Sequence, residues 1–150
     1  MTFLLPTLIG VIIFILGQYM LKMVIEPVQA FRASLGRLSN TILRYQAKIT
    51  NASVDDELSG RVHDHAADIV STSSTIMFYR FARRVFGLPT KEGIIKAAQN
   101  LNGIAYSLSG AAREFEDSPS FMAAKPNHAA AVGDSLIIIQ KELRIRTSYA

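Results

Sequence analysis

The chain opens with an apolar run, from Phe3 to Leu21, that contains no charged side chain. At about 1.5 Å per residue, a helix of this length just crosses the ~30 Å hydrocarbon layer of a bilayer. No Lys or Arg precedes the run and no small-x-small cleavage site follows it, which disfavours a cleaved secretory signal. The sequence therefore predicts that residues 1–26 form a retained transmembrane helix.

Basic side chains lie on the C-terminal side of this run, beginning at Lys22 and continuing with Arg32 and Arg37. An excess of Lys and Arg marks the side of a membrane segment that is not translocated. We therefore expect the N-terminus to lie outside and residues 27–150 to lie in the cytoplasm. The absence of cysteine agrees with a reducing compartment.

Beyond Pro27 the apolar positions recur every three or four residues, which is the period of an amphipathic helix. The first helix is marked by Val28, Phe31, Leu35, Leu38, Ile42, Tyr45 and Ile49. Pro27 suits the first turn of a helix, so we expect the membrane helix to bend there and continue as a stalk. With no alternating strand pattern along the chain, the sequence predicts an all-α fold.

The cytoplasmic part is expected to be an antiparallel four-helix bundle. Its helices are predicted over about 27–50, 54–86, 90–116 and 127–146. Ser53 and Thr90 are the expected N-caps of the second and third helices. The poor helix-forming run Ser71–Thr75 is a candidate break within the second helix, which Gly87 and the following proline should end.

This topology places charges at opposite ends of the bundle. The tip far from the membrane should carry Asp55, Asp56, Glu57, Glu114, Glu116 and Asp117, whereas the near end should carry Arg80, Arg83, Arg84, Lys91, Arg144 and Arg146. With a net charge of +4, the chain has a modest attraction for anionic partners. A bundle that is basic beside the bilayer suits anionic lipid headgroups.

The segment Phe78–Phe86 is the densest cluster of aromatic and basic residues in the chain. One interpretation is an interfacial anchor, with aromatic rings in the headgroup layer and guanidinium groups on lipid phosphates. A second is a binding site in which Arg80, Arg83 and Arg84 hold a phosphate-bearing ligand such as a nucleotide or oligonucleotide. Pairing with the chain's own carboxylates is a third.

Small and polar residues punctuate the predicted membrane helix. Thr7, Gly10 and Gly17 fall on one stripe, in line with the buried face of the next helix if the helical phase continues through Pro27. Small residues allow membrane helices to approach closely, which indicates self-association. Gln18 is a candidate for lining a pore in such an oligomer; alternatively it reaches the cytoplasmic interface and the glycines are neutral.

No catalytic signature accompanies these features, and we expect no enzymatic activity, cofactor or bound metal. His63, His65 and Asp68 form the only stretch with the composition of a metal site. On a helix, however, residues two apart face nearly opposite sides, so the two histidines should not share an ion. The sequence has neither a phosphate-binding loop nor a nucleophile elbow.

The segment Ile25–Leu38 contains a Glu26-Pro27 step followed by an Arg-x-x-x-Gly pattern that starts at Arg32. In this it resembles a class of small bacterial single-pass membrane proteins. The overall organisation is similar to that of membrane effectors of bacterial antiphage systems, including the Hailong type, whose oligomers act as channels gated by an oligonucleotide. The second resemblance is architectural and assigns no site residue.

Together these observations favour a homo-oligomeric protein of the bacterial inner membrane that acts as a ligand-regulated effector or ion channel in antiphage defence. Its partners would be the lipid bilayer, further copies of itself, and a nucleotide or oligonucleotide regulator or a cytoplasmic protein. The alternative function is a non-conducting, membrane-tethered scaffold or accessory subunit that binds a protein partner or anionic lipid.

Overall fold

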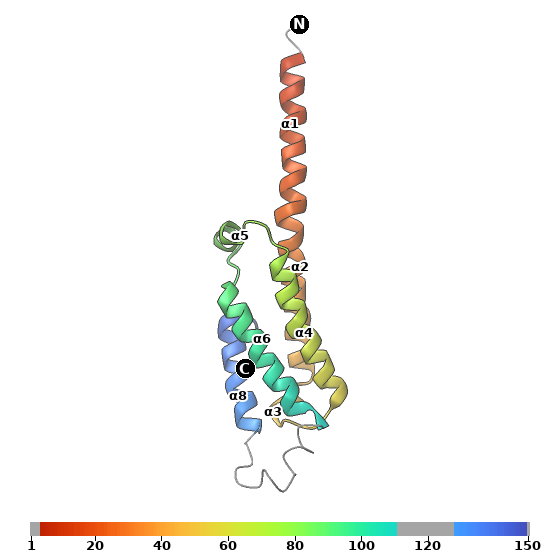
Figure 1. Ribbon diagram of the computed structural model, residues 1–150, viewed down its shortest axis with the longest axis vertical. Helices are drawn as coiled ribbons and strands as arrows, with labels where there is room; N and C mark the ends of the chain where they lie inside the picture. The colour runs from red at the N-terminus through yellow and green to blue at the C-terminus, as the bar shows by residue number, and fades with distance from the viewer. Residues whose placement is uncertain (1–3, 111–127, 150) are drawn as a thin grey trace.

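The computed structural model describes residues 4–110 and 128–149, and in this part of the chain the protein is helical with no strand. A long apolar helix, α1 (Leu4–Met20), projects from one end of a helical bundle, as Figure 1 shows. The all-α fold predicted from the sequence is thereby confirmed. A helix long and apolar enough to cross a membrane spans Leu5–Arg44, near the N-terminus.

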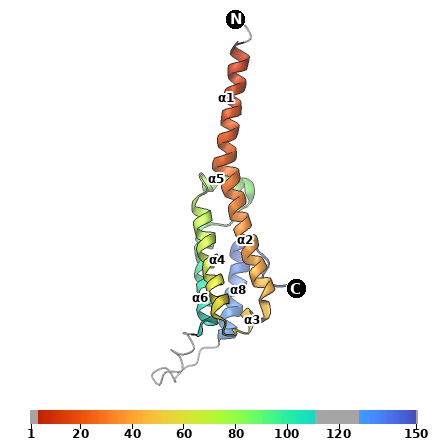
Figure 2. The same cartoon turned by 90° about the vertical axis from the view of Figure 1, so that its right-hand side faces the viewer.

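Between α1 and the bundle the chain passes through a wider turn without a break. This turn is the π-helical segment η1 (Leu21–Ile25), in which the Glu26 N–H donates to the Leu21 carbonyl five residues earlier. It leads directly into α2 (Glu26–Arg44). Pro27 explains the widening, because proline has no N–H to donate and its ring would clash with the carbonyl four residues before it. In place of the predicted bend, both views show a continuous rod (Figures 1 and 2).

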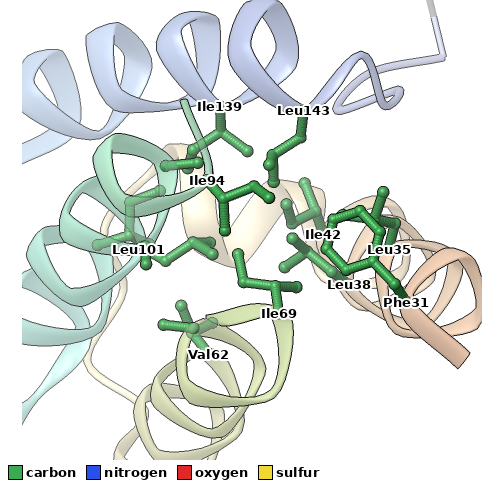
Figure 3. Packing of buried hydrophobic residues seen from close by; sticks show 14 of the residues in the cluster. Phe31, Leu35, Leu38, Ile42, Val62, Ile69, Ile94, Leu101, Ile139 and Leu143 are labelled. Atoms are coloured by element: carbon green, nitrogen blue, oxygen red, sulfur yellow. The ribbon is translucent and has the colours of Figure 1, made fainter. Parts of the chain in front are cut away.

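The bundle is formed by α2 together with α4 (Asp56–Ser74), α6 (Lys91–Leu108) and α8 (His128–Leu143). These four helices run alternately away from α1 and back toward it, as Figure 2 shows. Each of them contributes fully buried apolar side chains to one core. In Figure 3 that core is seen as Phe31, Leu38 and Ile42 of α2 packed toward Ile69, Leu101 and Ile139 of the other helices.

Several predicted helix boundaries were wrong. The first helix breaks at Tyr45, after which the short α3 (Gln46–Thr50) follows. The second divides into α4 and a separate helix, α5 (Tyr79–Phe86), and α4 ends at Ser74, within the run Ser71–Thr75 that was the candidate break. The third ends at Leu108, where Ser109 becomes extended, rather than near residue 116. Residues 111–127, including Glu114, Glu116 and Asp117, lie outside the described part.

The end of α8 also differs from the expectation. Arg144 adopts a left-handed backbone with φ of 57°, which reverses the chain after α8. As a result, Ser39 in the C-terminal half of α2 donates to the Arg146 carbonyl at 2.7 Å, and Thr147 donates to the Gln140 side chain at 2.9 Å. Arg146 therefore lies beside the C-terminal half of α2 and not at the end near α1.

The N-caps of α4 and α6 depend on side-chain acceptors. The cap of α4 is Asp55, not Ser53, and its carboxylate accepts from the Leu58 N–H at 3.0 Å. Thr90 caps α6 as predicted, since its hydroxyl accepts from the Gly93 N–H at 2.8 Å. Both caps satisfy backbone donors that the first turn of a helix leaves without partners.

Thr90→Ala is expected to lower the free energy of unfolding by about 1 kcal/mol, because the Gly93 N–H loses its acceptor. Thr90→Ser retains the hydroxyl, so its free energy of unfolding should differ from that of the unchanged protein by less than about half of that loss. Urea unfolding of the full chain in mild detergent, followed by circular dichroism, measures both. Equal losses for the two variants would show that the hydroxyl is not the stabilising group.

Candidate functional site

Helix α5 carries the aromatic and basic cluster and is set apart by unusual backbone at both ends. Phe78, before its first residue, has φ of 52°, a left-handed conformation that turns the chain away from the axis of α4. After the last residue, Gly87 has φ of 65° and its N–H donates to the Arg83 carbonyl. Glycine suits this position because it has no Cβ to clash in the left-handed region.

Three contacts hold α5 against the bundle. Tyr79 is buried, and its hydroxyl donates to the Pro89 carbonyl at 2.9 Å. Burial raises the pKa of this hydroxyl, an effect that nearby Arg83 opposes. Arg32 of α2 donates to the Phe86 carbonyl at 2.6 Å, placing a cation at the C-terminal end of the α5 dipole. The third contact is Lys91, whose ammonium group lies 5.3 Å from the Tyr79 ring centre.

The outward face of α5 is apolar and basic. Phe78 is 72% exposed, while Phe81 and Val85 are each 57% exposed. Arg80, Arg83 and Arg84 are also exposed. An amphipathic helix in water normally buries its apolar stripe. Here Tyr79 and Ala82 are buried and Phe86 packs partly buried against the core, but Phe81 and Val85 remain exposed. This face therefore suits an environment that accepts both apolar and cationic groups.

Four arginines converge beside α5. A pocket of about 410 Å³ is lined by Arg80, Arg83, Arg84, Gly87, Leu88 and Arg144. Within residues 4–110 and 128–149, none of these four guanidinium groups forms an ion pair with a carboxylate. The reversal at the end of α8 brings Arg144 to this pocket. Guanidinium groups recognise phosphate through paired N–H donors, so the pocket is a candidate phosphate-binding site.

A larger, open hollow of about 670 Å³ adjoins this pocket and shares Arg80 and Arg83 with it. It is lined by Phe78, Tyr79, Arg80, Phe81, Arg83, Thr90, Lys91 and Glu92. Aromatic side chains and arginines thus meet in one place, as the sequence predicted for a nucleotide or a lipid site. Glu92 is the single acidic side chain in this lining.

The acidic residues at the far tip have structural partners. Asp55 pairs with Lys48 at 2.8 Å, and this hydrogen bond, together with the Leu58 N–H, holds the pKa of Asp55 below its ordinary value. Asp56 accepts from the Gly110 N–H at 2.8 Å. Glu57 pairs with Arg61 at 2.6 Å within α4. These contacts secure the helix ends.

The predicted oligomerisation residues lie on the exposed part of α1. Thr7, Gly10, Gly17 and Gln18 are all exposed, and a Cβ added at either glycine would meet nothing within 4 Å. The π turn changes the predicted alignment, because one extra residue in a turn rotates α1 by about 100° relative to α2. The glycine stripe therefore does not continue the buried face of α2 but lies to one side of it.

The histidine cluster has a structural role. His65 is half-buried, and its Nε2 lies 2.8 Å from the Thr41 hydroxyl on α2. Burial lowers the pKa of His65 below its ordinary value of 6.5. Asp68 instead pairs with Arg37 at 2.8 Å, and His63 is exposed. In the described residues no group of three acidic, histidine or cysteine side chains could hold a metal ion.

In the described residues these features define a helical-bundle protein with one helix long and apolar enough to cross a membrane, and with a basic, aromatic helix beside the end of the bundle that is nearest to it. Comparison with family models, curated proteins and solved structures found no match to this chain.

Proposed function

We propose that the protein is a homo-oligomeric, single-pass protein of a bacterial inner membrane that acts as a ligand-regulated effector or ion channel in antiphage defence. In this proposal α1 spans the bilayer with its N-terminus outside, and the bundle lies in the cytoplasm. The excess of basic residues after Leu21 supports this orientation.

The observation that carries the proposal is the continuous 40-residue helix Leu5–Arg44. Its second half is fixed in the bundle through Phe31, Leu38 and Ile42, whereas the side chains of α1 from Leu5 to Met20 are all exposed in the single chain. A displacement of the bundle would therefore move the membrane helix as well, since both belong to one rod. This is the mechanical link that a ligand-controlled membrane effector requires.

The rotation introduced by η1 supports assembly around a central axis. If the glycine stripe lay on the same side of the rod as the buried face of α2, the other three helices of the bundle would stand on that side. They would then occupy the space beneath the contact between α1 helices of neighbouring copies. The rotation of about 100° places the bundle to one side of that contact instead. Several copies could then pack through Gly10 and Gly17 with their bundles arranged around the axis.

The regulatory ligand in this proposal is a phosphate-bearing molecule held by Arg80, Arg83, Arg84 and Arg144. These four groups meet in one pocket and have no carboxylate partner in the described residues. The pocket lies close to the base of α1, so a ligand there would act on the part of the bundle nearest the membrane. Phosphate contacts predict that binding weakens as salt rises.

A non-conducting scaffold is the second candidate, and one observation favours it. The helix α1 consists almost entirely of aliphatic and aromatic residues, with Thr7, Gln18 and Tyr19 as its side chains able to form hydrogen bonds. A pore lined by such helices would be mostly apolar and would resist water and ions. Ion conduction would therefore need the polar side chain of Gln18, whereas a membrane tether would not need it.

Ion flux separates the two candidates. Inside-out vesicles containing the full chain should release potassium when short oligonucleotides are added, and Gln18→Leu should reduce this flux at least about tenfold by removing the polar lining. Gln18→Asn keeps the amide and is the matched control. Absence of flux from inserted protein, both with oligonucleotides and on overproduction in cells, would reject the channel and favour the scaffold.

A further inference from the structure

We propose that α5 is an interfacial helix that lies in the headgroup layer of an anionic bilayer. Its apolar side chains would enter the outer part of the hydrocarbon, and its arginines would bind lipid phosphates. The inference rests on the part of the proposed function in which α1 spans the membrane. It adds a second membrane contact that would hold the base of the bundle against the leaflet.

The short distance along the helix between the apolar run and the start of the bundle leaves no space between the bundle and the bilayer surface. Lys22 is the first charged residue after the apolar run, so it marks the boundary of the hydrocarbon. Val24 is already buried in the bundle core, only two residues or about 3 Å further along the helix. Because each headgroup layer is roughly 5–7 Å thick, the base of the bundle must lie within it.

Helix α5 lies at this level. Figures 1 and 2 show it set across the long axis of the molecule, next to the point where α1 passes into α2. The contact from Arg32 on α2 to the Phe86 carbonyl ties its C-terminal end to that region. A helix parallel to the membrane plane can place one face in the bilayer along its whole length.

The side chains on α5 match this environment. Phe78, Phe81 and Val85 are more than half exposed in the chain by itself, which indicates a surface that another phase covers. Aromatic residues concentrate at membrane interfaces, and long basic side chains reach from there to phosphate groups. Helix α5 exposes both Phe81 and Val85 and its three arginines, so both requirements are met by one helix.

Charge complementarity favours an anionic leaflet over a protein partner. Arg80, Arg83 and Arg84 have no carboxylate partner in the described residues, and Arg144 joins them from α8. Lipid phosphates lie at the depth that α1 sets for α5, whereas a dissolved phosphate ligand would have to compete with them. The shared chemistry is a phosphate group. In the absence of the regulatory ligand the source we infer is the lipid headgroup, which a dissolved ligand would have to displace from the arginines.

The natural sequence offers a clean measurement, because it contains no tryptophan. The full chain is reconstituted in vesicles of phosphatidylcholine and phosphatidylglycerol whose lipids carry bromine close to the headgroup, where bromine quenches indole fluorescence. Phe81→Trp reports on α5 and Phe14→Trp on α1. Tyr106→Trp is the matched aromatic control, since Tyr106 is exposed on α6 toward the far tip.

We expect brominated lipid to quench Phe81→Trp at least about twofold and to leave Tyr106→Trp unchanged, as an interfacial depth requires. Adding Arg80→Gln, Arg83→Gln and Arg84→Gln to Phe81→Trp, or omitting phosphatidylglycerol, should reduce the quenching. Circular dichroism of each variant verifies that the helices remain folded.

Equal fluorescence of Phe81→Trp in brominated and unbrominated vesicles would overturn the inference, provided that Phe14→Trp is quenched. Unquenched Phe14→Trp would instead remove the membrane span on which the proposed function depends. Fluorescence of Phe81→Trp that responds to dissolved oligonucleotide or inorganic phosphate, but not to brominated lipid, would also reject the lipid surface and identify a soluble ligand.

Discussion

Phe31→Ala is expected to lower the free energy of unfolding of the bundle by about 3–5 kcal/mol. Phe31 is fully buried on α2, and Figure 3 shows it beside Leu35 and Leu38 in the core. Truncation removes a large apolar group and leaves a cavity that helices packed on several sides cannot close. This loss should remove a large fraction of the free energy of unfolding of a domain of this size.

Urea unfolding of the full chain in mild detergent, followed by far-ultraviolet circular dichroism, measures this loss. The apolar helix α1 should stay helical in the micelle, so the transition reports on the bundle. Phe81→Ala removes the same atoms from an exposed site on α5 and should change the unfolding free energy by at most about 0.5 kcal/mol. Similar losses for the two variants would contradict the packing of α2 in the core.

Isoleucine at both Gly10 and Gly17 is expected to weaken self-association of α1 at least about tenfold, or ~1.4 kcal/mol. A Cβ at either glycine meets nothing within 4 Å in the single chain, so the substitutions leave its own fold undisturbed. Isoleucine is also more apolar than glycine and does not weaken insertion into a bilayer. A loss of assembly would therefore report on contact with another copy.

The chain contains no cysteine, which makes disulfide crosslinking a direct readout. Phe14→Cys places a thiol between the two glycines on the same stripe, and paired helices should crosslink there when their Cα atoms lie within about 7 Å. Leu16→Ile, on another face of α1, is the control and should leave the crosslinked fraction unchanged. If the glycine replacements also leave it unchanged, the stripe is not the contact between copies.

Periodicity made most of the helices predictable. The three-four spacing of Phe31, Leu35, Leu38 and Ile42 identified the buried face of α2, because a helix turns once every 3.6 residues. Thr90 was recognisable as a cap since its hydroxyl precedes an apolar-periodic run. The charges of the near end were also placed correctly for Arg80, Arg83 and Arg84, because an antiparallel return follows from helix length alone.

Other boundaries had no local signal. Tyr45 interrupts the first helix without a glycine or proline, and Phe78 takes a left-handed conformation that phenylalanine rarely adopts. Tertiary packing stabilises both, since burial of Ile49 and Tyr79 favours the turned chain over a straight helix. Pro27 did signal an irregularity, but whether a proline produces a bend or a π turn depends on the packing of the helix that follows it.

The sequence by itself determined that this protein is helical, that its N-terminal segment is apolar enough to cross a membrane, and that its basic residues follow that segment. These properties depend on residues close together in the chain, where helical period and hydropathy leave a readable pattern. Only the tertiary structure decided that α5 lies across the base of the bundle, that Arg144 joins its arginines, and that η1 rotates α1 relative to α2. The first two depend on contacts between distant segments, which leave no periodic trace in the sequence. For η1, Pro27 marked the position, and the packing of α2 decided the form of the irregularity.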